Sequence, residues 1–117
     1  PQGITSIQSS TFWYCTQLTK ITIPDSVKSI GCHAFSDCTG LKTINVPSSV
    51  TKIGSYAFAS CTSLTSITIN VVTPPDVFHI FDNCSKLTAI YVPAGSVEAY
   101  KAASGWSEFA DKIQAMA

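Results

Sequence analysis

Five cysteines are the residues of this chain most able to do chemistry, and four of them stand 23 positions apart. These four form one column: Cys15, Cys38, Cys61 and Cys84. One thiol per repeated unit makes a straight ladder, whereas a zinc site needs four ligands that converge tetrahedrally. Disulfides along the ladder are disfavoured too, because parallel Cβ vectors do not converge on an S–S bond. We therefore predict four free thiols, each packed like a small hydrophobic residue.

The other candidates for chemistry are Cys32, for which we predict an exposed thiol without an assigned role, and two histidines. The histidines share a second column with a tyrosine, in which we expect neighbouring rings to stack: His33, Tyr56 and His79. By the spacing of stacked strands the two imidazoles lie roughly 10 Å apart, too far to share a metal ion. The nearest acids, Asp37 and Asp82, belong to other columns. We therefore predict no catalytic residue, no metal ligand, no cofactor and no enzyme activity.

The composition excludes some classes of partner. Seven Lys balance seven Asp and Glu, and there is no Arg, whereas nucleic-acid-binding proteins normally carry a basic surplus with Arg forks. We therefore expect no nucleic-acid partner. No apolar run reaches the roughly 18 residues of a membrane span, so we expect no span in the chain. The chain opens without a basic-then-apolar leader, and we expect any signal peptide to lie outside it.

The cysteine ladder is one of several columns with the same period, and these columns define the elements that must position it. Phe, Leu and two Ile or Val positions also recur every 23 residues. The columns are Phe12, Phe35, Phe58 and Phe81; Leu18, Leu41, Leu64 and Leu87; Ile21, Ile44, Ile67 and Ile90; and Ile23, Val46, Ile69 and Val92. A period of this length around L-x-x-I-x-I lies within the range of leucine-rich repeats.

Each repeat is predicted to form one coil of an α/β solenoid. Residues 20–24 alternate two inward isoleucines with an outward threonine, which is typical of a short strand. Stacked coils place such strands about 4.8 Å apart in a parallel sheet, here on the concave side. Residues 27–31 turn inward again as a second short strand. The A-F-x-x-C segment over 34–38 has the spacing of a single helical turn on the convex side.

The repeated phrase is specific enough to indicate a family. "IPDSVKSIGCHAFSDCTGLKTI", residues 23–44, resembles the BspA-like leucine-rich repeats of bacterial surface proteins, and the tail from residue 87 resembles the end of such arrays. The resemblance implies a bacterial secreted or surface-anchored protein. It also implies an extracellular or cell-surface location and adhesive contacts with host or neighbouring-cell proteins.

Two parts are expected along the chain. Residues 1–93 are the leucine-rich repeat solenoid, with a partial first coil and repeats that start at 18, 41, 64 and 87. Pro74 and Pro75 remove two backbone donors where the second strand of one coil would run, so that strand should stop there. After Pro93 the period is lost, and we expect a helical C-terminal cap over residues 94–117 that covers the open end of the solenoid.

The cap prediction depends on two features of the tail. Ser96 precedes a helix-forming stretch and is the expected N-cap. Beyond Gly105, four apolar residues recur at helical spacing: Trp106, Phe109, Ile113 and Met116. One apolar face of a helix would then pack on the last coil.

The chain opens where the strand of a repeat has just ended, since Pro1 aligns with Pro24. We therefore expect a piece of a longer array; the alternative is a natural end that a partner or a second copy covers. Ile4, Ile7 and Phe12 would lie at an uncovered edge, next to the unpaired backbone of the first complete strand. Such an edge favours pairing with another chain, so we expect self-association through it.

Outward residues of the expected sheet are candidates for binding, because solenoids use their extended concave faces to bind partners. These residues are Lys20, Thr22, Thr43, Asn45, Ser66, Thr68 and Tyr91. Trp13, Tyr14 and Phe78 are further candidates for exposed contacts, since aromatic residues are enriched in interfaces. The other interpretation of the face is that Ser and Thr are simply good solvated strand formers.

The sequence thus supports two functions. One is a non-enzymatic protein-interaction or adhesion module that binds a host or neighbouring-cell protein through the concave sheet face. The other is a structural spacer or stalk fragment with no ligand of its own. The second differs from the first only in leaving the sheet face without a partner.

Overall fold

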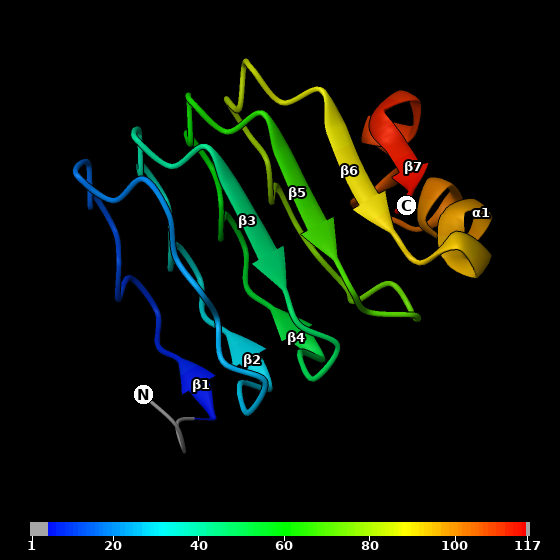
Figure 1. Ribbon diagram of the computed structural model, residues 1–117, viewed down its shortest axis with the longest axis horizontal. Coiled ribbons are helices and arrows are strands. Elements are labelled where there is room, and N and C mark those ends of the chain that lie inside the picture. Colours follow the sequence, from blue (N-terminus) through cyan, green and yellow to red (C-terminus); the bar gives the residue numbers. More distant parts are fainter. Residues whose placement is uncertain (1–4, 117) are drawn as a thin grey trace.

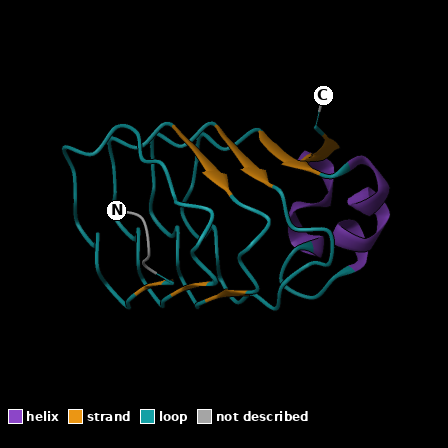
Figure 2. Ribbon diagram, turned by 60° about the horizontal axis from the view of Figure 1, so that its bottom comes forward, coloured by secondary structure: helices purple, strands orange, loops and turns teal. Residues whose placement is uncertain are grey.

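Short parallel strands run along two sides of a stack of coils in the computed structural model, which describes residues 5–116 (Figure 1). The smaller sheet contains, in order, β1 (Ser6–Ile7), β2 (Ser29–Ile30) and β4 (Lys52–Ile53). The larger contains β3 (Thr43–Val46), β5 (Ser66–Ile69), β6 (Ala89–Val92) and β7 (Ile113–Ala115). Figure 2 shows the two sheets on opposite sides of the coils, with the helices gathered at one end.

Neighbouring strands pair with an offset equal to the period of the sequence columns. Ile44 of β3 lies opposite Ile67 of β5, and Ile67 lies opposite Ile90 of β6. In the smaller sheet Ser29 lies opposite Lys52. Each coil therefore stacks on the next without a shift of register, and every sequence column becomes a row of neighbouring side chains.

Alternation within the strands separates core from surface. In β3, Thr43 and Asn45 are exposed, whereas Ile44 between them is buried. The phenylalanine column is stacked ring on ring, with centroids 5.1, 5.4 and 6.1 Å apart from Phe12 to Phe81. Rows of this kind bury for each coil the apolar edge that it cannot bury alone.

Gly31 and Gly54, which follow β2 and β4, have no room for a side chain. A Cβ at Gly31 would lie 2.4 Å from the backbone nitrogen of Ser9, and a Cβ at Gly54 would lie 2.4 Å from that of Cys32. Neighbouring coils approach too closely there for any residue but glycine. Val77 stands at the equivalent position of the following coil, where the smaller sheet has ended.

The smaller sheet ends at β4, as the two prolines predict. Pro74 and Pro75 occupy the positions that Thr51 and Lys52 hold one coil earlier. Neither proline has an N–H to donate to a ladder, and residues 71–77 contain no strand. The prediction that the second strand stops here is confirmed.

Residues 20–24 are not a strand, so that prediction is wrong. The segment lies beside β3, and the N–H of Lys42 donates to the carbonyl oxygen of Thr19 at a long 3.4 Å. At the next interface the N–H of Asn70 donates to the carbonyl oxygen of Val46 at 3.0 Å. Pro47 occupies the position of Asn70 one coil earlier and has no N–H, which removes that bond from the first coil.

The convex side forms turns instead of the predicted single helical turns. Each coil has two residues with a positive φ four positions apart, which a right-handed helix does not contain. The two columns are Ser10, His33, Tyr56 and His79, and Tyr14, Asp37, Ser60 and Asn83. Between them the N–H groups donate alternately within the coil and to the next coil, as Phe35 does to Ala57 at 2.8 Å. The convex side is thus a further hydrogen-bonded ladder between coils.

The C-terminal cap follows β6 with η1 (Ala94–Ser96), α1 (Val97–Ala102) and η2 (Ser107–Lys112). Ser96 holds the predicted N-cap position, but its hydroxyl donates to the carbonyl oxygen of Val72 at 2.6 Å and not to the helix. The cap contains helices, but the predicted single helical face from Trp106 to Met116 is wrong, because Ile113 lies in β7. Since β7 pairs with β6, the cap and the solenoid share the larger sheet.

Side chains of the cap donate hydrogen bonds to carbonyl groups of residues 71–75. The hydroxyl of Tyr100 donates to the carbonyl oxygen of Val71 at 2.5 Å, and Nε1 of Trp106 donates to that of Pro75 at 2.9 Å. Both aromatic side chains are fully buried and meet edge to face with centroids 4.9 Å apart. The end of the solenoid is therefore closed by rings that also satisfy its carbonyl groups.

The first coil is less covered than the coils that follow it. Its column residues are half-buried: Phe12, Cys15, Leu18 and Ile21. Ile7 is buried in β1, which corrects its expected place at an uncovered edge. Ile4 lies outside the described residues. Self-association through this edge stays a prediction.

Candidate binding surface

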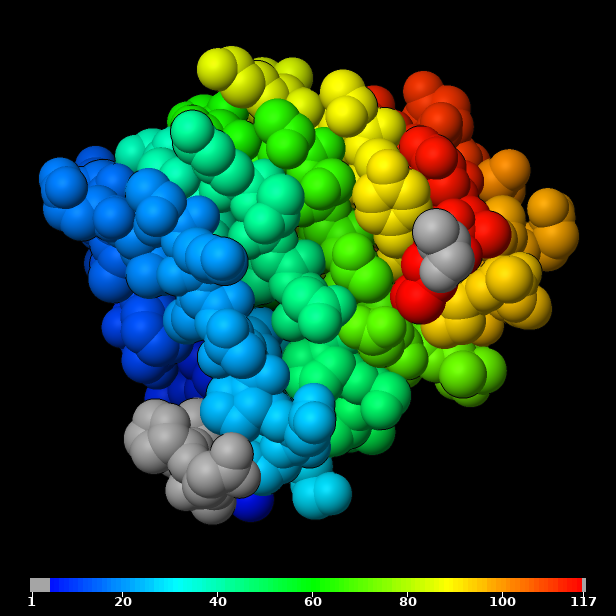
Figure 3. Space-filling model, viewed as in Figure 1, coloured from blue at the N-terminus to red at the C-terminus, as the bar shows by residue number. Residues whose placement is uncertain are grey.

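The outward face of the larger sheet gathers the predicted binding residues. A shallow hollow of about 250 Å³ crosses residues 20–23, β3 and β5. Six of the seven predicted residues line it: Lys20, Thr22, Thr43, Asn45, Ser66 and Thr68. The seventh, Tyr91, lies on β6 opposite Thr68. This face is turned toward the viewer in Figure 3, between the blue first coil and the yellow β6.

Hydroxyls, one amide and one ammonium group make the hollow a surface that can donate and accept hydrogen bonds. Asn45 is held in place by Asn70, whose Nδ2 donates to Oδ1 of Asn45 at 2.6 Å and to the carbonyl oxygen of Val46 at 2.9 Å. The sequence columns alone do not single out Asn70, which stands where Pro47 stands one coil earlier. Its amide fixes which hydrogen-bonding groups Asn45 presents to a ligand.

The three exposed aromatic residues lie on turns and not on the larger sheet. Trp13, Tyr14 and Phe78 expose 51%, 66% and 63% of their surface, which confirms that they are exposed. Nε1 of Trp13 donates to Oδ2 of Asp37 at 3.1 Å, and Phe78 meets the ring of His79 edge-on at 4.4 Å. Their separation from the hollow means that they do not extend the sheet face.

The histidine column is a stack of rings, as predicted. The rings of His33 and Tyr56 are 5.0 Å apart and those of Tyr56 and His79 are 5.2 Å apart, each pair nearly parallel. His79 also contacts an acid from another column, since its Nδ1 lies 2.9 Å from Oδ2 of Asp82. Within residues 5–116, no three His, Cys, Asp or Glu side chains come together in a way that could hold a metal ion.

The cysteine column forms its own ladder of hydrogen bonds, and all five thiols are free. The Sγ of Cys38 donates to the carbonyl oxygen of Phe12 at 3.1 Å, and that of Cys61 donates to Phe35 at 3.1 Å. Burial raises the pKa of the Cys38 thiol to about 11 and that of the Cys84 thiol also to about 11. Burial raises the pKa of Cys61 further still. The protonated thiols therefore act as weak donors as well as apolar filling.

Accessibility separates the thiols in a way that titration should detect. Cys32 is exposed, and of the four column thiols only Cys38 and Cys61 are fully buried, whereas Cys15 and Cys84 are half-buried. We expect a thiol reagent at neutral pH to modify Cys32 at once and Cys15 more slowly, because the reagent needs an accessible thiolate. Cys38 and Cys61 should react only after denaturation, when all five groups become available. Mass spectrometry that found two or more disulfides in the native protein would contradict this expectation.

The sequence of the chain matches the profile described as the BspA type leucine rich repeat region, in six copies, over residues 1–104. The chain belongs to the BspA-type leucine-rich repeat family. The match covers the stacked coils of this BspA-type chain and continues past α1. No curated protein matches the chain.

Solved structures of bacterial repeat proteins share the fold of these BspA-type coils. A leucine-rich repeat protein from Eubacterium ventriosum ATCC 27560 has 32% identity and a TM-score of 0.73, over 80% of this chain and 25% of that one. A leucine rich cell surface protein from Faecalibacterium prausnitzii A2-165 has 28% identity and a TM-score of 0.61, over 83% of this chain and 35% of that one. A leucine-rich repeat protein from Bacteroides ovatus ATCC 8483 has 31% identity and a TM-score of 0.52, over 80% of this chain and 30% of that one.

The BspA-type chain spans about a quarter to a third of the length of these proteins. Its family and fold suggest a protein-interaction or surface role. None of the helices within residues 5–116 combines the length and the apolar character needed to cross a membrane.

Proposed function

We propose that this chain is a non-enzymatic protein-interaction module of a bacterial secreted or cell-surface protein, and that it adheres to a host or neighbouring-cell protein through the larger sheet. The observation that carries the proposal is the hollow on that sheet, whose lining combines Lys20, Asn45 and hydroxyl groups in register. Thr43, Asn45, Ser66 and Thr68 lie on strands that pair in register, so their spacing is set before a partner arrives, and little entropy is lost on binding.

Two further observations support this proposal. The family match and the likeness to a cell surface protein from Faecalibacterium prausnitzii favour a location outside the cell. Most of the side chains that line the hollow are polar, which favours a protein surface over a small apolar ligand, since small-molecule sites are usually mostly apolar. Hydroxyls and amides can pair with backbone and side-chain groups of a flat partner surface.

A matched pair of variants tests the sheet face. The double variant Thr43→Glu with Ser66→Glu places two carboxylates in the hollow. The control variant Thr62→Glu with Ser85→Glu places the same two charges on exposed turns that do not line the hollow. We expect the first variant to bind immobilised extracellular-matrix proteins at least about tenfold more weakly, because a partner surface would have to desolvate the new charges. The second variant should bind like the unsubstituted chain.

Circular dichroism and thermal melting of both variants control for folding. Equal binding by both variants would contradict the role of the sheet face. Absence of binding by the unsubstituted chain to every matrix protein tested would favour a structural spacer. Surface plasmon resonance at two salt concentrations measures the affinities and separates specific contacts from general charge attraction.

A further inference from the structure

The carbonyl groups of the smaller sheet are satisfied by the following coil until β4 is reached. The carbonyl oxygen of Lys28 accepts a hydrogen bond from the N–H of Thr51 at 2.8 Å, and that of Ile30 accepts one from Gly54 at 2.7 Å. The acceptors and donors are thus provided at fixed positions of the repeat. One coil later, the same acceptor positions are the carbonyl oxygens of Thr51 and Ile53.

No backbone donor reaches these two carbonyl groups from the coil that follows. Pro74 stands at the position of the first donor and has no N–H. Val77 stands at the position of the second donor, and no backbone hydrogen bond joins residues 71–77 to residues 47–54 anywhere in the described part of the chain. β4 therefore presents an edge with acceptors at strand spacing and no donor opposite them.

The cap holds the following segment away from this edge. The carbonyl groups of Val71, Val72 and Pro75 all accept hydrogen bonds from cap side chains on the far side. A Cβ at Gly105 would lie 2.4 Å from the carbonyl oxygen of Val77, so the cap backbone is in close contact with this segment as well. The segment is fixed to the cap and does not close over β4.

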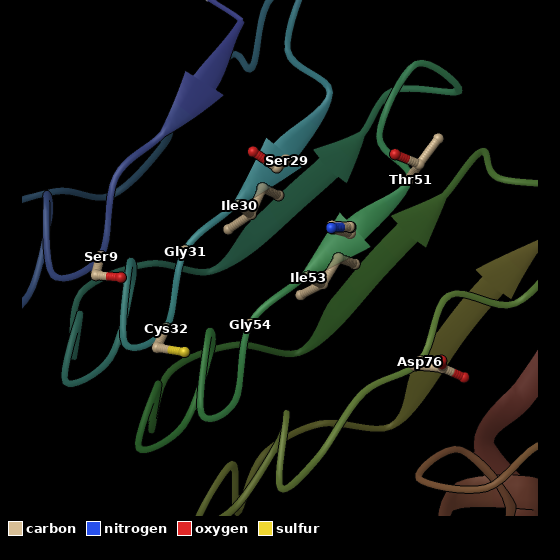
Figure 4. Close-up of a pocket in the computed structure, with 10 residues that line it drawn as sticks. Ser9, Ser29, Ile30, Gly31, Cys32, Thr51, Ile53, Gly54 and Asp76 are labelled. Carbon is tan, nitrogen blue, oxygen red and sulfur yellow. The ribbon is translucent and has the colours of Figure 1, made fainter.

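Two adjoining hollows meet beside this edge, at Thr51 and Asp76. One, of about 540 Å³, extends from Ser9 in the first coil across the smaller sheet to Asp76. The second, of about 460 Å³, is lined by residues of both walls, and Thr51 and Asp76 line both hollows. Figure 4 shows Asp76 across from Thr51 and Ile53, on the chain that runs past the end of the smaller sheet.

We propose that the edge of β4 is a second binding site, which takes an extended segment of another protein as an added parallel strand. Addition of a strand to an exposed sheet edge is a general mode of peptide recognition, in which main-chain hydrogen bonds supply the affinity. An occupant here donates two N–H groups three residues apart to Thr51 and Ile53. The site is separate from the hollow on the larger sheet and does not depend on it.

The neighbouring strands define the chemistry of the occupant. β1, β2 and β4 pair in register as S-I, S-I and K-I, so a β-branched residue continues the buried row of the sheet. Glycine follows β2 and β4 because the backbone of the preceding coil leaves no room for a Cβ. The carboxylate of Asp76 on the opposite wall favours a basic residue in the occupant. The site therefore fits an extended segment that combines Lys, a β-branched residue and Gly.

A synthetic peptide with these properties tests the proposal. The capped peptide SSVTKIG copies residues 48–54, and its Thr and Gly carry the two donors. In an NMR titration of the full 117-residue chain, we expect saturable shifts at Thr51, Ile53, Gly54 and Asp76. N-methylation of the Thr and Gly of the peptide removes both donors and should weaken binding at least about tenfold. Absence of saturable shifts, or equal binding of the methylated peptide, overturns the proposal.

Two variants and one further measurement complete the test. Asp76→Lys reverses the charge on the wall opposite Thr51, so it should weaken binding of the lysine-containing peptide, and unchanged binding would contradict the role of this wall. Thr43→Glu with Ser66→Glu should leave peptide binding unchanged, and this separates the site from the sheet face. If dilution of the protein alone shifts the β4 signals, a second copy occupies the edge and the assignment to a separate partner is wrong.

Discussion

Replacement of Trp106 by alanine is expected to lower the free energy of unfolding by about 3 to 5 kcal/mol. The side chain is fully buried, packs edge to face against Phe81 and Tyr100, and donates to the carbonyl oxygen of Pro75. Its removal leaves a cavity at the end of the solenoid and a carbonyl group without its donor. A loss of this size is a large part of the total stability of a small domain, so equilibrium unfolding in urea should show it clearly.

Trp13→Ala is the matched control, because it removes the same side chain from a position that is 51% exposed. It should cost less than about 1 kcal/mol, as most surface substitutions do. Trp106→Phe should cost less than Trp106→Ala, since it keeps an aromatic ring and loses mainly the hydrogen bond. Equal effects of the two alanine substitutions would refute the idea that the cap closes the solenoid through Trp106.

The stacked columns could be predicted from the sequence because each column is a physical contact. Phe35 and Phe58 stack ring on ring, and Cys38 and Cys61 each donate to the preceding coil. When a residue contacts the equivalent residue of the next coil, the same residue type is favoured in every coil, so it recurs in the sequence at the length of one repeat. The end of the smaller sheet could be predicted for a different reason, since proline removes a donor wherever it stands.

The turns of the convex side and the strand β7 do not follow from the sequence as directly, because in both places the residues also fit the spacing of a helix. A-F-x-x-C fits one helical turn, but the left-handed conformation is favoured by residues such as His33, Asp37 and Asn83, which tolerate positive φ. Ile113 recurs at helical spacing after Trp106, yet it also lies one period beyond Ile90, and the structure follows that period. Reading the isoleucine column one step further would have predicted β7.

The candidate surface could be predicted only in part. The outward residues of β3 and β5 follow from strand alternation, and the hollow brings them together. Asn70 does not follow from alternation, since its role depends on a side-chain bond to Asn45 across the sheet. The hollows beside β4 could not be predicted either. They depend on where Ser96 and Trp106 of the cap hold residues 71–77, through hydrogen bonds to Val72 and Pro75.

Stability of the chain is expected to fall steeply between pH 9 and pH 11, because the thiol ladder must stay protonated. Burial raises the pKa of Cys38 from the ordinary 9.0 to about 11. As pH rises above 9, the unfolded chain loses this proton while the native thiol keeps it. The unfolded state then binds fewer protons than the native state, so the free energy of unfolding falls with pH, and it is unaffected at pH 7 to 8.

For Cys38 the loss amounts to roughly 2 kcal/mol at pH 11. Cys61 is fully buried, and its pKa is raised more strongly by the same cause. The pKa of Tyr100 is likewise raised by burial, so its hydroxyl contributes in the same direction at higher pH. These effects act in the same direction, so we expect stability to continue falling as the pH rises through this range.

Urea unfolding at pH 8, 9, 10 and 11 in the presence of a reductant measures the effect, and Cys38→Ser isolates one thiol. Serine can still donate to the carbonyl oxygen of Phe12 but does not ionise in this range. Above pH 9 the unsubstituted chain should therefore lose more stability than Cys38→Ser. By pH 11 its free energy of unfolding should have fallen by roughly 2 kcal/mol more than that of the variant. Lysine deprotonation on the surface affects both proteins alike and cancels in the difference. Parallel curves of stability against pH would mean that the Cys38 thiol ionises as readily in the native state as in the unfolded chain. Burial in the ladder would then not raise its pKa.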